Sequence, residues 1–157
     1  TRLACVTGVQ TCALPISEES GPLRSEANSA KLDLIHLVAP TSTPDRMRKI
    51  ARASSGFLYM VSLTGVTGAR AELPAELAQH LRTLRGITTK PICVGFGIGT
   101  PAQAAAVGQA ADGVIVGSAI VQLIEKHAGQ ADLVTKVGDF IASLKEPLRP
   151  AGSGSRT

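Results

Sequence analysis

The chain has 157 residues, of which 44% are hydrophobic, 18% charged and 3% aromatic, and its formal net charge is +4. These proportions are ordinary for a soluble globular protein, and a core without Trp must be built mainly from Ala, Val, Leu and Ile. No stretch reaches the ~18 apolar residues of a membrane-spanning helix, and the three cysteines give neither a disulfide framework nor a zinc-binding spacing.

The positive charge raises the question of nucleic-acid binding. Basic residues cluster on one predicted helix, where they surround three apolar positions: Arg46, Arg48, Lys49 and Arg52 around Met47, Ile50 and Ala51. A solvated helix face explains this pattern better than a nucleic-acid site, because no stacking aromatic residues accompany it. We therefore expect neither nucleic acid nor a membrane as a partner.

The first 17 residues differ from the rest of the chain. They hold one Arg and an apolar run broken by Thr, Gly and Gln, which makes a poor signal peptide, so the cytoplasm is the expected compartment. The sequence also does not begin with Met. We expect residues 1–17 to be foreign or artefactual sequence at the end of a gene fragment, with a divergent strand around Leu3 to Val9 as the alternative.

Helices and strands alternate from residue 18 onward. Residues 22–30 predict a short helix, and the apolar run 34–38 predicts a strand in which His36 is more simply a satisfied core residue than a ligand. Thr43, Pro44 and Asp45 supply a hydroxyl cap, a first-turn proline and a favourable carboxylate for the next helix. Alternation in the strand 57–62 places Phe57, Tyr59 and Val61 on one face, and Leu58, Met60 and Ser62 on the other.

The second part of the chain repeats this pattern. A polar loop with two glycines, residues 64–72, precedes a helix over 75–85 that Gly86 should end, and strands follow at 91–94 and 113–116. A last helix carries an apolar stripe that we expect to pack on the sheet: Leu133, Val137, Phe140, Ile141 and Leu144. Residues 18–146 are thus the folded part, and the tail 147–157 should be disordered. The alternation predicts an α/β fold with parallel strands and right-handed crossovers.

Glycine marks the two junctions where the last two strands meet their helices. One junction spans Gly95 to Gly99 before the cap residue Thr100, and the other is Gly117-Ser118. Such turns present free backbone N–H groups beside a helix N-terminus, which is a geometry that binds a phosphate dianion. Tight packing of strand against helix would also explain the glycines. A dinucleotide site fits poorly, because Asp112 precedes the next strand instead of closing it.

Five segments carry a resemblance to a known family. In chain order they are EESGPLR, LVAPTSTPDR, GFLYMVSLTGVTGAR, GFGIGTPAQA and ADGVIVGSAIV. Together they resemble the C-terminal half of the tryptophan synthase alpha chain, from about residue 18 to residue 145. The resemblance implies strands five to eight of a TIM (β/α)8 barrel. A whole barrel needs about 250 residues, so strands one to four are expected to be missing here.

The resemblance also implies a substrate site. The family's phosphate contacts correspond to Gly68, Gly97, Gly117 and Ser118, through backbone N–H groups and the Ser118 hydroxyl. Gly99 stands where the family often has Ser, and we expect no loss of binding from that difference because the backbone amide is retained.

Other positions correspond to the family's apolar wall and mobile loop. Phe96 and Ile115 match wall positions, Tyr59 lines the pocket, and Thr67 lies on a loop that closes over the substrate. The alternatives are that Tyr59 is a core aromatic residue and that residues 64–72 are an ordinary surface connection.

The activity implied by the resemblance is that of a lyase in tryptophan biosynthesis, which cleaves indole-3-glycerol phosphate to indole and glyceraldehyde 3-phosphate. The family's catalytic Glu and Asp belong to the second strand and the loop after it, so neither is expected in this chain. Asp33 and Asp112 precede their strands and would lie at the wrong end of the barrel, and Glu72 has no paired acid. We therefore expect no catalytic residue and no turnover.

The family's partner is a beta subunit in an alpha2beta2 assembly, and pyridoxal phosphate belongs to that subunit. We expect no cofactor or metal in this chain and a weakened or lost association with the beta subunit. Two other functions stay open. One is another phosphate-binding barrel, such as a sugar-phosphate isomerase or epimerase, which the Tyr-bearing strand disfavours. The other is a truncated, non-catalytic phosphate-binding module.

Overall fold

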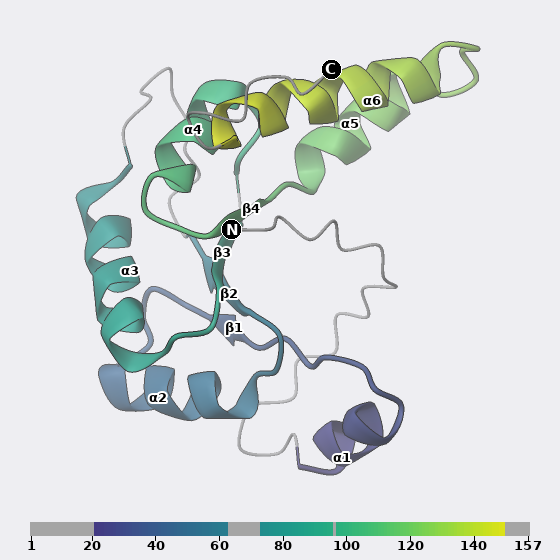
Figure 1. The fold of residues 1–157 in the computed structure, drawn as a ribbon. Helices are drawn as coiled ribbons and strands as arrows, with labels where there is room; N and C mark the ends of the chain where they lie inside the picture. The colour runs from purple at the N-terminus through teal and green to yellow at the C-terminus, as the bar shows by residue number, and fades with distance from the viewer. Residues whose placement is uncertain (1–20, 63–72, 96, 150–157) are drawn as a thin grey trace, which may run out of the picture.

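A computed structural model of the chain describes residues 21–62, 73–95 and 97–149. Its helices and strands are α1 (Gly21–Ser29), β1 (Leu37–Val38), α2 (Pro44–Ala53), β2 (Leu58–Val61), α3 (Ala75–Ile87), β3 (Ile92–Gly95), α4 (Pro101–Gly108), β4 (Gly113–Ile115), α5 (Ser118–Lys126), α6 (Leu133–Lys145) and the 3-10 helix η1 (Glu146–Leu148) (Figure 1). Within these ranges, no helix is long and apolar enough to cross a membrane.

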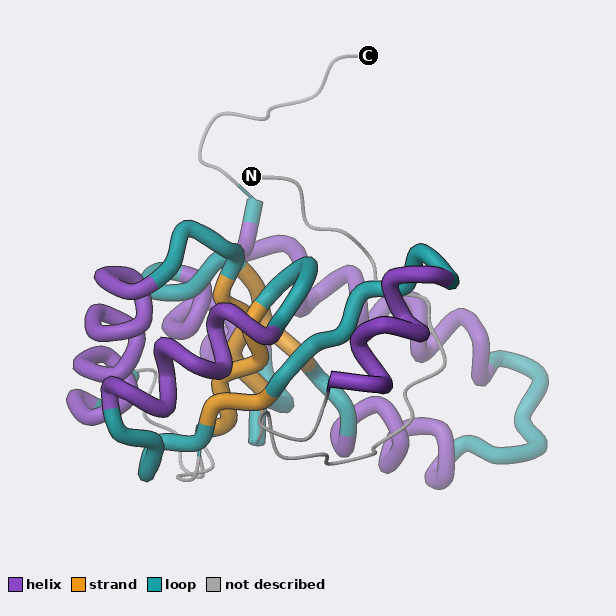
Figure 2. Tube along the Cα trace, turned by 90° about the horizontal axis from the view of Figure 1, so that it is seen from below, coloured by secondary structure: helices purple, strands orange, loops and turns teal. Residues whose placement is uncertain are grey.

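The four strands form one parallel sheet in the order β1-β2-β3-β4, and they lie side by side at the centre of the molecule (Figure 2). The register aligns Leu37 with Tyr59, Tyr59 with Cys93, and Cys93 with Gly113. A helix connects each strand to the next, as expected for successive β/α units. The predicted α/β fold with parallel strands is therefore confirmed.

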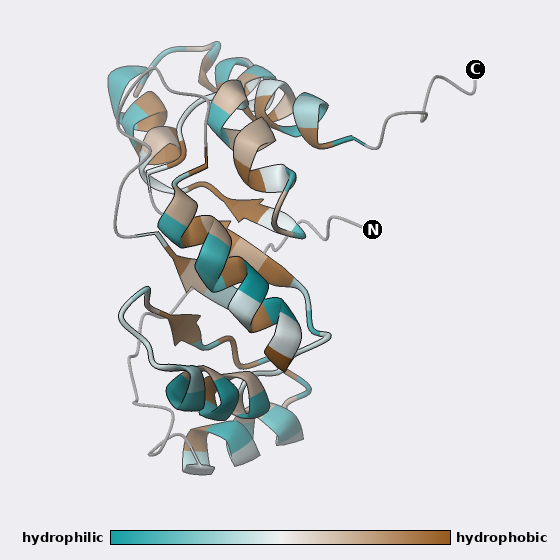
Figure 3. Ribbon diagram, turned by 90° about the vertical axis from the view of Figure 1, so that its left-hand side faces the viewer, coloured by the Kyte–Doolittle hydropathy of each residue, from teal (hydrophilic) through white to brown (hydrophobic). Residues whose placement is uncertain are grey.

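The hydrophobic core lies between one face of this sheet and the helices. The sheet supplies Leu58, Met60 and Ile92, which are all 0% exposed, and α2, α3 and α4 supply the opposing apolar side chains. Viewed from the helix side, α3 crosses in front of the strands (Figure 3). In β2 the buried residues alternate with the half-buried Tyr59 and Val61, so the predicted alternation is correct.

The other side of the sheet, which we call the open face, carries Leu37, Tyr59, Val61, Cys93 and Ile115. None of the five belongs to the hydrophobic core of the described residues. Leu37 is 45% exposed, and the other four are half-buried. The chain thus packs the helix side of its sheet and leaves apolar surface on the open face.

Strand β1 is shorter than the predicted strand 34–38. Serine hydroxyls replace part of its backbone pairing: the N–H of Leu34 donates to Ser55 Oγ (2.7 Å) and that of His36 to Ser54 Oγ (3.0 Å). His36 is buried as predicted, but its Nε2 has no hydrogen-bond partner among the described residues, so the prediction of a satisfied histidine is wrong.

Three predictions about the helices also differ from the structure. Helix α3 continues through Gly86 to Ile87, because Gly86 does not adopt the positive φ with which a glycine ends a helix. Thr88 is the C-cap. Helix α6 packs against α4, α5 and η1 rather than on the sheet, and of its predicted stripe only Leu144 is fully buried. Pro147 and Leu148 are ordered in η1, where Leu148 packs close to Gly108.

Candidate functional site

The two glycine junctions lie at the carboxyl edge of the sheet, where β3 and β4 end. In the first, Gly97 has a φ of +76°, a left-handed conformation that favours glycine. In the second, Gly117 precedes the first residue of α5 and is exposed. Since parallel strands β3 and β4 are neighbours, both turns emerge on the same edge.

The two turns lie close to each other. A Cβ atom placed on Gly99 would lie 3.4 Å from the Cβ of Ala119, the second residue of α5, so it would just reach van der Waals contact. The first turn is therefore near the N-terminus of the helix that follows the second turn, as a shared ligand site requires.

The N-terminus of α4 is closed by its own side chains. Gln103 Oε1 accepts hydrogen bonds from the N–H of Gly99 (2.9 Å) and of Thr100 (3.1 Å), while Thr100 Oγ1 accepts from the N–H of Gln103 (3.3 Å). This is a capping box. The prediction of free N–H groups is therefore wrong at Gly99 and Thr100, and the amide at Gly99 is already paired. The N–H groups of Gly97 and Ile98 have no acceptor among the described residues.

The N-terminus of α5 is open by comparison. Its N-cap is Gly117, which offers no side-chain hydrogen bond, and the N–H groups of Ser118 and Ala119 have no acceptor within the described ranges. Among the described residues other than Gly117 and its two chain neighbours, no atom lies within 4 Å of the position that a Cβ on Gly117 would occupy. Unpaired N–H groups at the positive end of a helix dipole attract an anion.

Tyr59 and Ile115 extend the site onto the open face. The Tyr59 ring lies against Gly95, because a Cβ atom on Gly95 would approach the Tyr59 hydroxyl oxygen to 2.2 Å. Gly95 is in turn the register partner of Ile115. The sequence predicts Gly95 only as the first residue of the glycine junction, but Gly95 ends β3 and lies against the Tyr59 ring, as a glycine inside a strand often does where another group approaches closely.

Three predicted site residues lie outside the described residues, namely Phe96, Thr67 and Gly68. Glu72, which was rejected as a catalytic acid, lies outside them too. Among those that the structure describes, it brings together Gly97, Gly117, Ser118 and Ile115 around the ends of β3 and β4, with Tyr59 on the neighbouring strand.

The two carboxylates that precede strands, Asp33 and Asp112, lie away from this edge. Asp112 lies at the amino ends of β3 and β4, where its Oδ2 accepts from the N–H of Ile92 (2.8 Å) and from Arg85. Burial alone would raise the pKa of Asp112, but these two hydrogen bonds outweigh it and lower the pKa. Asp33 is also at the amino edge, next to Gly56. No group of three or more potential metal ligands occurs within the described ranges.

The family model described as "Tryptophan synthase alpha chain" matches residues 1–148. The chain belongs to the tryptophan synthase alpha chain family. The match begins before residue 18, so it includes the segment 1–17 that was expected to be foreign, and that segment lies outside the described residues.

Individual relatives agree with this membership. The tryptophan synthase alpha chain of Geobacter sp. (strain M21) is 49% identical over 129 residues, which are 82% of this chain and 48% of the relative. An aminoacrylate-bound tryptophan synthase from M. tuberculosis matches with a TM-score of 0.71 and 30% identity, over 86% of this chain and 48% of the other.

A structure of the tryptophan synthase a2b2 complex from Pyrococcus furiosus matches with a TM-score of 0.71 and 28% identity, over 82% of this chain and 51% of the other. The chain thus spans about half the length of the tryptophan synthase alpha chains that it matches. Its four parallel β/α units are half of the family's TIM barrel, as the sequence predicts.

Proposed function

We propose that this chain holds the phosphate end of the substrate site of a tryptophan synthase alpha chain, a lyase acting on indole-3-glycerol phosphate. The observation that supports this most directly is the closeness of the two glycine turns, since a Cβ atom added to Gly99 would lie only 3.4 Å from the Cβ of Ala119. Four N–H groups without an acceptor among the described residues, those of Gly97, Ile98, Ser118 and Ala119, surround that point. Convergent backbone N–H groups at a helix N-terminus suit a phosphate dianion.

The substrate would extend from the phosphate over the open face. Ser118 would add its hydroxyl to the backbone N–H groups, since it is the exposed first residue of α5. Ile115 and Tyr59 would supply apolar contacts to the rest of the molecule. By the family resemblance, Phe96 would add to this wall, Gly68 would contact the phosphate, and Thr67 would lie on the loop that closes over the substrate.

We further propose that residues 1–157 alone do not catalyse the reaction. The described carboxylates at the amino edge, Asp33 and Asp112, are at the wrong end of the sheet to transfer protons to a substrate at the glycine turns. The catalytic Glu and Asp, and much of the surface for a pyridoxal-phosphate-bearing beta subunit, would come from the other half of the barrel. Purified chain should give no indole above background, and clear turnover would contradict this assignment.

A phosphate titration followed by NMR tests the proposed site. We expect binding in the millimolar range, equivalent to about 4 kcal/mol, with shifts at the amides of Gly97, Ser118 and Ala119. Gly117→Val should abolish it, because the branched side chain would occupy the space that the phosphate needs. The fold should survive, since Gly117 has a φ of −121° and the space around its Cβ position is open among the described residues beyond its chain neighbours.

A matched control is Gly138→Val in α6, where the Cβ position is also open and no phosphate contact is proposed. It should bind phosphate like the wild type. Ser118→Ala should weaken binding without abolishing it, because it removes one hydroxyl worth roughly 1.5–3 kcal/mol and leaves the backbone N–H groups in place. Equal binding by wild type and Gly117→Val would show that the glycines serve only strand–helix packing.

A further inference from the structure

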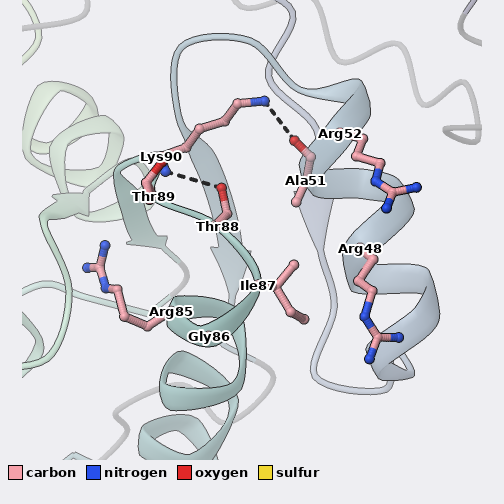
Figure 4. Close-up of a pocket in the computed structure, with 9 residues that line it drawn as sticks. All are labelled: Arg48, Ala51, Arg52, Arg85, Gly86, Ile87, Thr88, Thr89 and Lys90. Carbon is pink, nitrogen blue, oxygen red and sulfur yellow. Dashed lines mark hydrogen bonds between the residues drawn. The ribbon is translucent and has the colours of Figure 1, made fainter.

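A second concave surface lies at the opposite edge of the sheet from the glycine turns. It is a groove of about 580 Å³ between α2 and the connection from α3 to β3 (Figure 4). Cavities of a few hundred cubic ångströms are large enough for a small organic ligand. Its base is apolar, formed by Ala51 and Ile87, and its remaining lining is basic or polar.

The groove is positively charged. Four of its lining residues are cationic, namely Arg48, Arg52, Arg85 and Lys90, and none is acidic. Arg48 is paired with Asp45 and Arg85 with Asp112, so these two charges are compensated. Arg52 and Lys90 have no carboxylate partner in the part of the chain that the structure describes. The local excess is therefore two positive charges, which matches a dianion.

Lys90 is held in place at the top of the groove. Its Nζ donates to the carbonyl oxygen of Ala51 (2.7 Å) and to that of Ser54, which leaves one of its three N–H bonds for a ligand. Thr88 Oγ1 accepts from the N–H of Lys90 (3.1 Å), so the Thr88 hydroxyl hydrogen is available to donate. These fixed groups provide a partly preorganised anion site.

The arginines line the two sides of the groove. Arg48 and Arg52 extend from α2 on one side, and Arg85 extends from the end of α3 on the other (Figure 4). Arg48 and Arg52 are exposed, so rotation about their side-chain bonds can bring the guanidinium groups over the groove. Guanidinium groups bind phosphate oxygens in a bidentate manner.

We propose that this groove binds a phosphate monoester with an apolar body. The phosphate would lie between Arg52 and Lys90, with the Thr88 hydroxyl as a further donor, and the body would cover Ala51 and Ile87. This second site does not depend on the glycine turns or on the lyase assignment.

The test uses the full chain carrying Gly117→Val, so that the first phosphate site is blocked. Phenyl phosphate and inorganic phosphate are titrated separately and followed by amide shifts at residues 86–90. We expect phenyl phosphate to bind in the millimolar range and more tightly than inorganic phosphate, because only the former covers the apolar base. Adding Arg48→Gln and Arg52→Gln should weaken phenyl phosphate binding about tenfold.

The matched control is Lys49→Gln with Arg82→Gln, which also removes two charges from exposed helix positions, one on α2 and one on α3, both outside the groove. It should bind phenyl phosphate like the parent chain. Equal weakening by both double variants would show diffuse electrostatic attraction and overturn the proposal. Failure of phenyl phosphate to shift residues 86–90, or equal affinity for the two probes, would also overturn it. Circular dichroism should show the same helix content in every variant.

Discussion

The carboxylate of Asp112 joins the end of α3 to the start of β3, and its removal should destabilise the fold. Its Oδ2 accepts hydrogen bonds from the N–H of Ile92 (2.8 Å) and from Arg85, while the N–H of Asp112 donates to the Ile92 carbonyl oxygen (2.9 Å). Ile92 is 0% exposed. In Asp112→Ala the N–H of Ile92 would therefore lose its acceptor in a place that water reaches poorly.

The two contacts of this carboxylate differ in their expected contribution. A buried N–H without an acceptor costs about 1–3 kcal/mol. The ion pair with Arg85 is partly exposed, with side-chain exposures of 44% for Arg85 and 27% for Asp112, so it contributes about 0–1 kcal/mol. Asp112→Ala should thus lower the free energy of unfolding by about 2–3 kcal/mol, and Arg85→Gln by no more than about 1 kcal/mol.

The pH dependence follows from the lowered pKa of Asp112. Because the pKa is lower in the folded than in the unfolded chain, the stabilisation is present above about pH 4 and is lost as the pH falls through the folded pKa. Asp112→Asn keeps an oxygen acceptor but cannot ionise. Asp112→Asn should lower the free energy of unfolding at pH 7 less than Asp112→Ala does. Its stability should also lack the fall at acid pH that protonation of Asp112 causes.

Urea unfolding followed by circular dichroism at pH 7 and in the acid range measures these differences. Amide hydrogen exchange at Ile92 supplies a local readout, and Asp112→Ala should speed it selectively. If Asp112→Ala cost no more than Arg85→Gln and left exchange at Ile92 unchanged, the Asp112 carboxylate would not be the acceptor that stabilises this N–H group.

Three further outcomes are expected. Gly95→Ala should cost about 1–3 kcal/mol through overpacking against Tyr59, and Tyr59→Ala in the same chain should relieve it in urea unfolding. Burial, together with the charge of Arg24, lowers the pKa of His36, so stability should fall below pH 6.5 by up to about 1.4 kcal/mol per pH unit, and His36→Leu should flatten that slope. Purified chain should self-associate through the open face in sedimentation experiments, whereas a monomer at all concentrations would contradict this.

Much of the fold could be predicted from local patterns. Alternation in residues 57–62 correctly separated Leu58 and Met60 from Tyr59, which lie on opposite faces of the sheet. Thr43 and Pro44 correctly marked the start of α2, where Thr43 Oγ1 accepts from the N–H of Arg46 (3.4 Å). These features depend on residues that are neighbours in the chain, so they can be predicted from the sequence alone.

The missed features depend mostly on contacts between distant residues. The apolar stripe of α6 shows that the helix is buried on one side, but it does not say that α4 rather than the sheet covers it. The serine hydroxyls that shorten β1 come from residues 18 and 21 positions away. The closed N-terminus of α4 is different, because Thr100 and Gln103 have the spacing of a capping box and could have been recognised.

The position of the core explains why phosphate binding and chemistry can separate in this chain. The glycine turns are fixed by β3, β4, α4 and α5, whose packing does not involve the open face. A proton-transfer group must instead reach the substrate from that face, within about 3 Å of the reacting atom. Among the described residues the open face carries no carboxylate or histidine, and burial raises the pKa of the Cys93 thiol, which therefore stays protonated at neutral pH. This distribution supports the proposal that residues 1–157 bind the phosphate without catalysing the reaction.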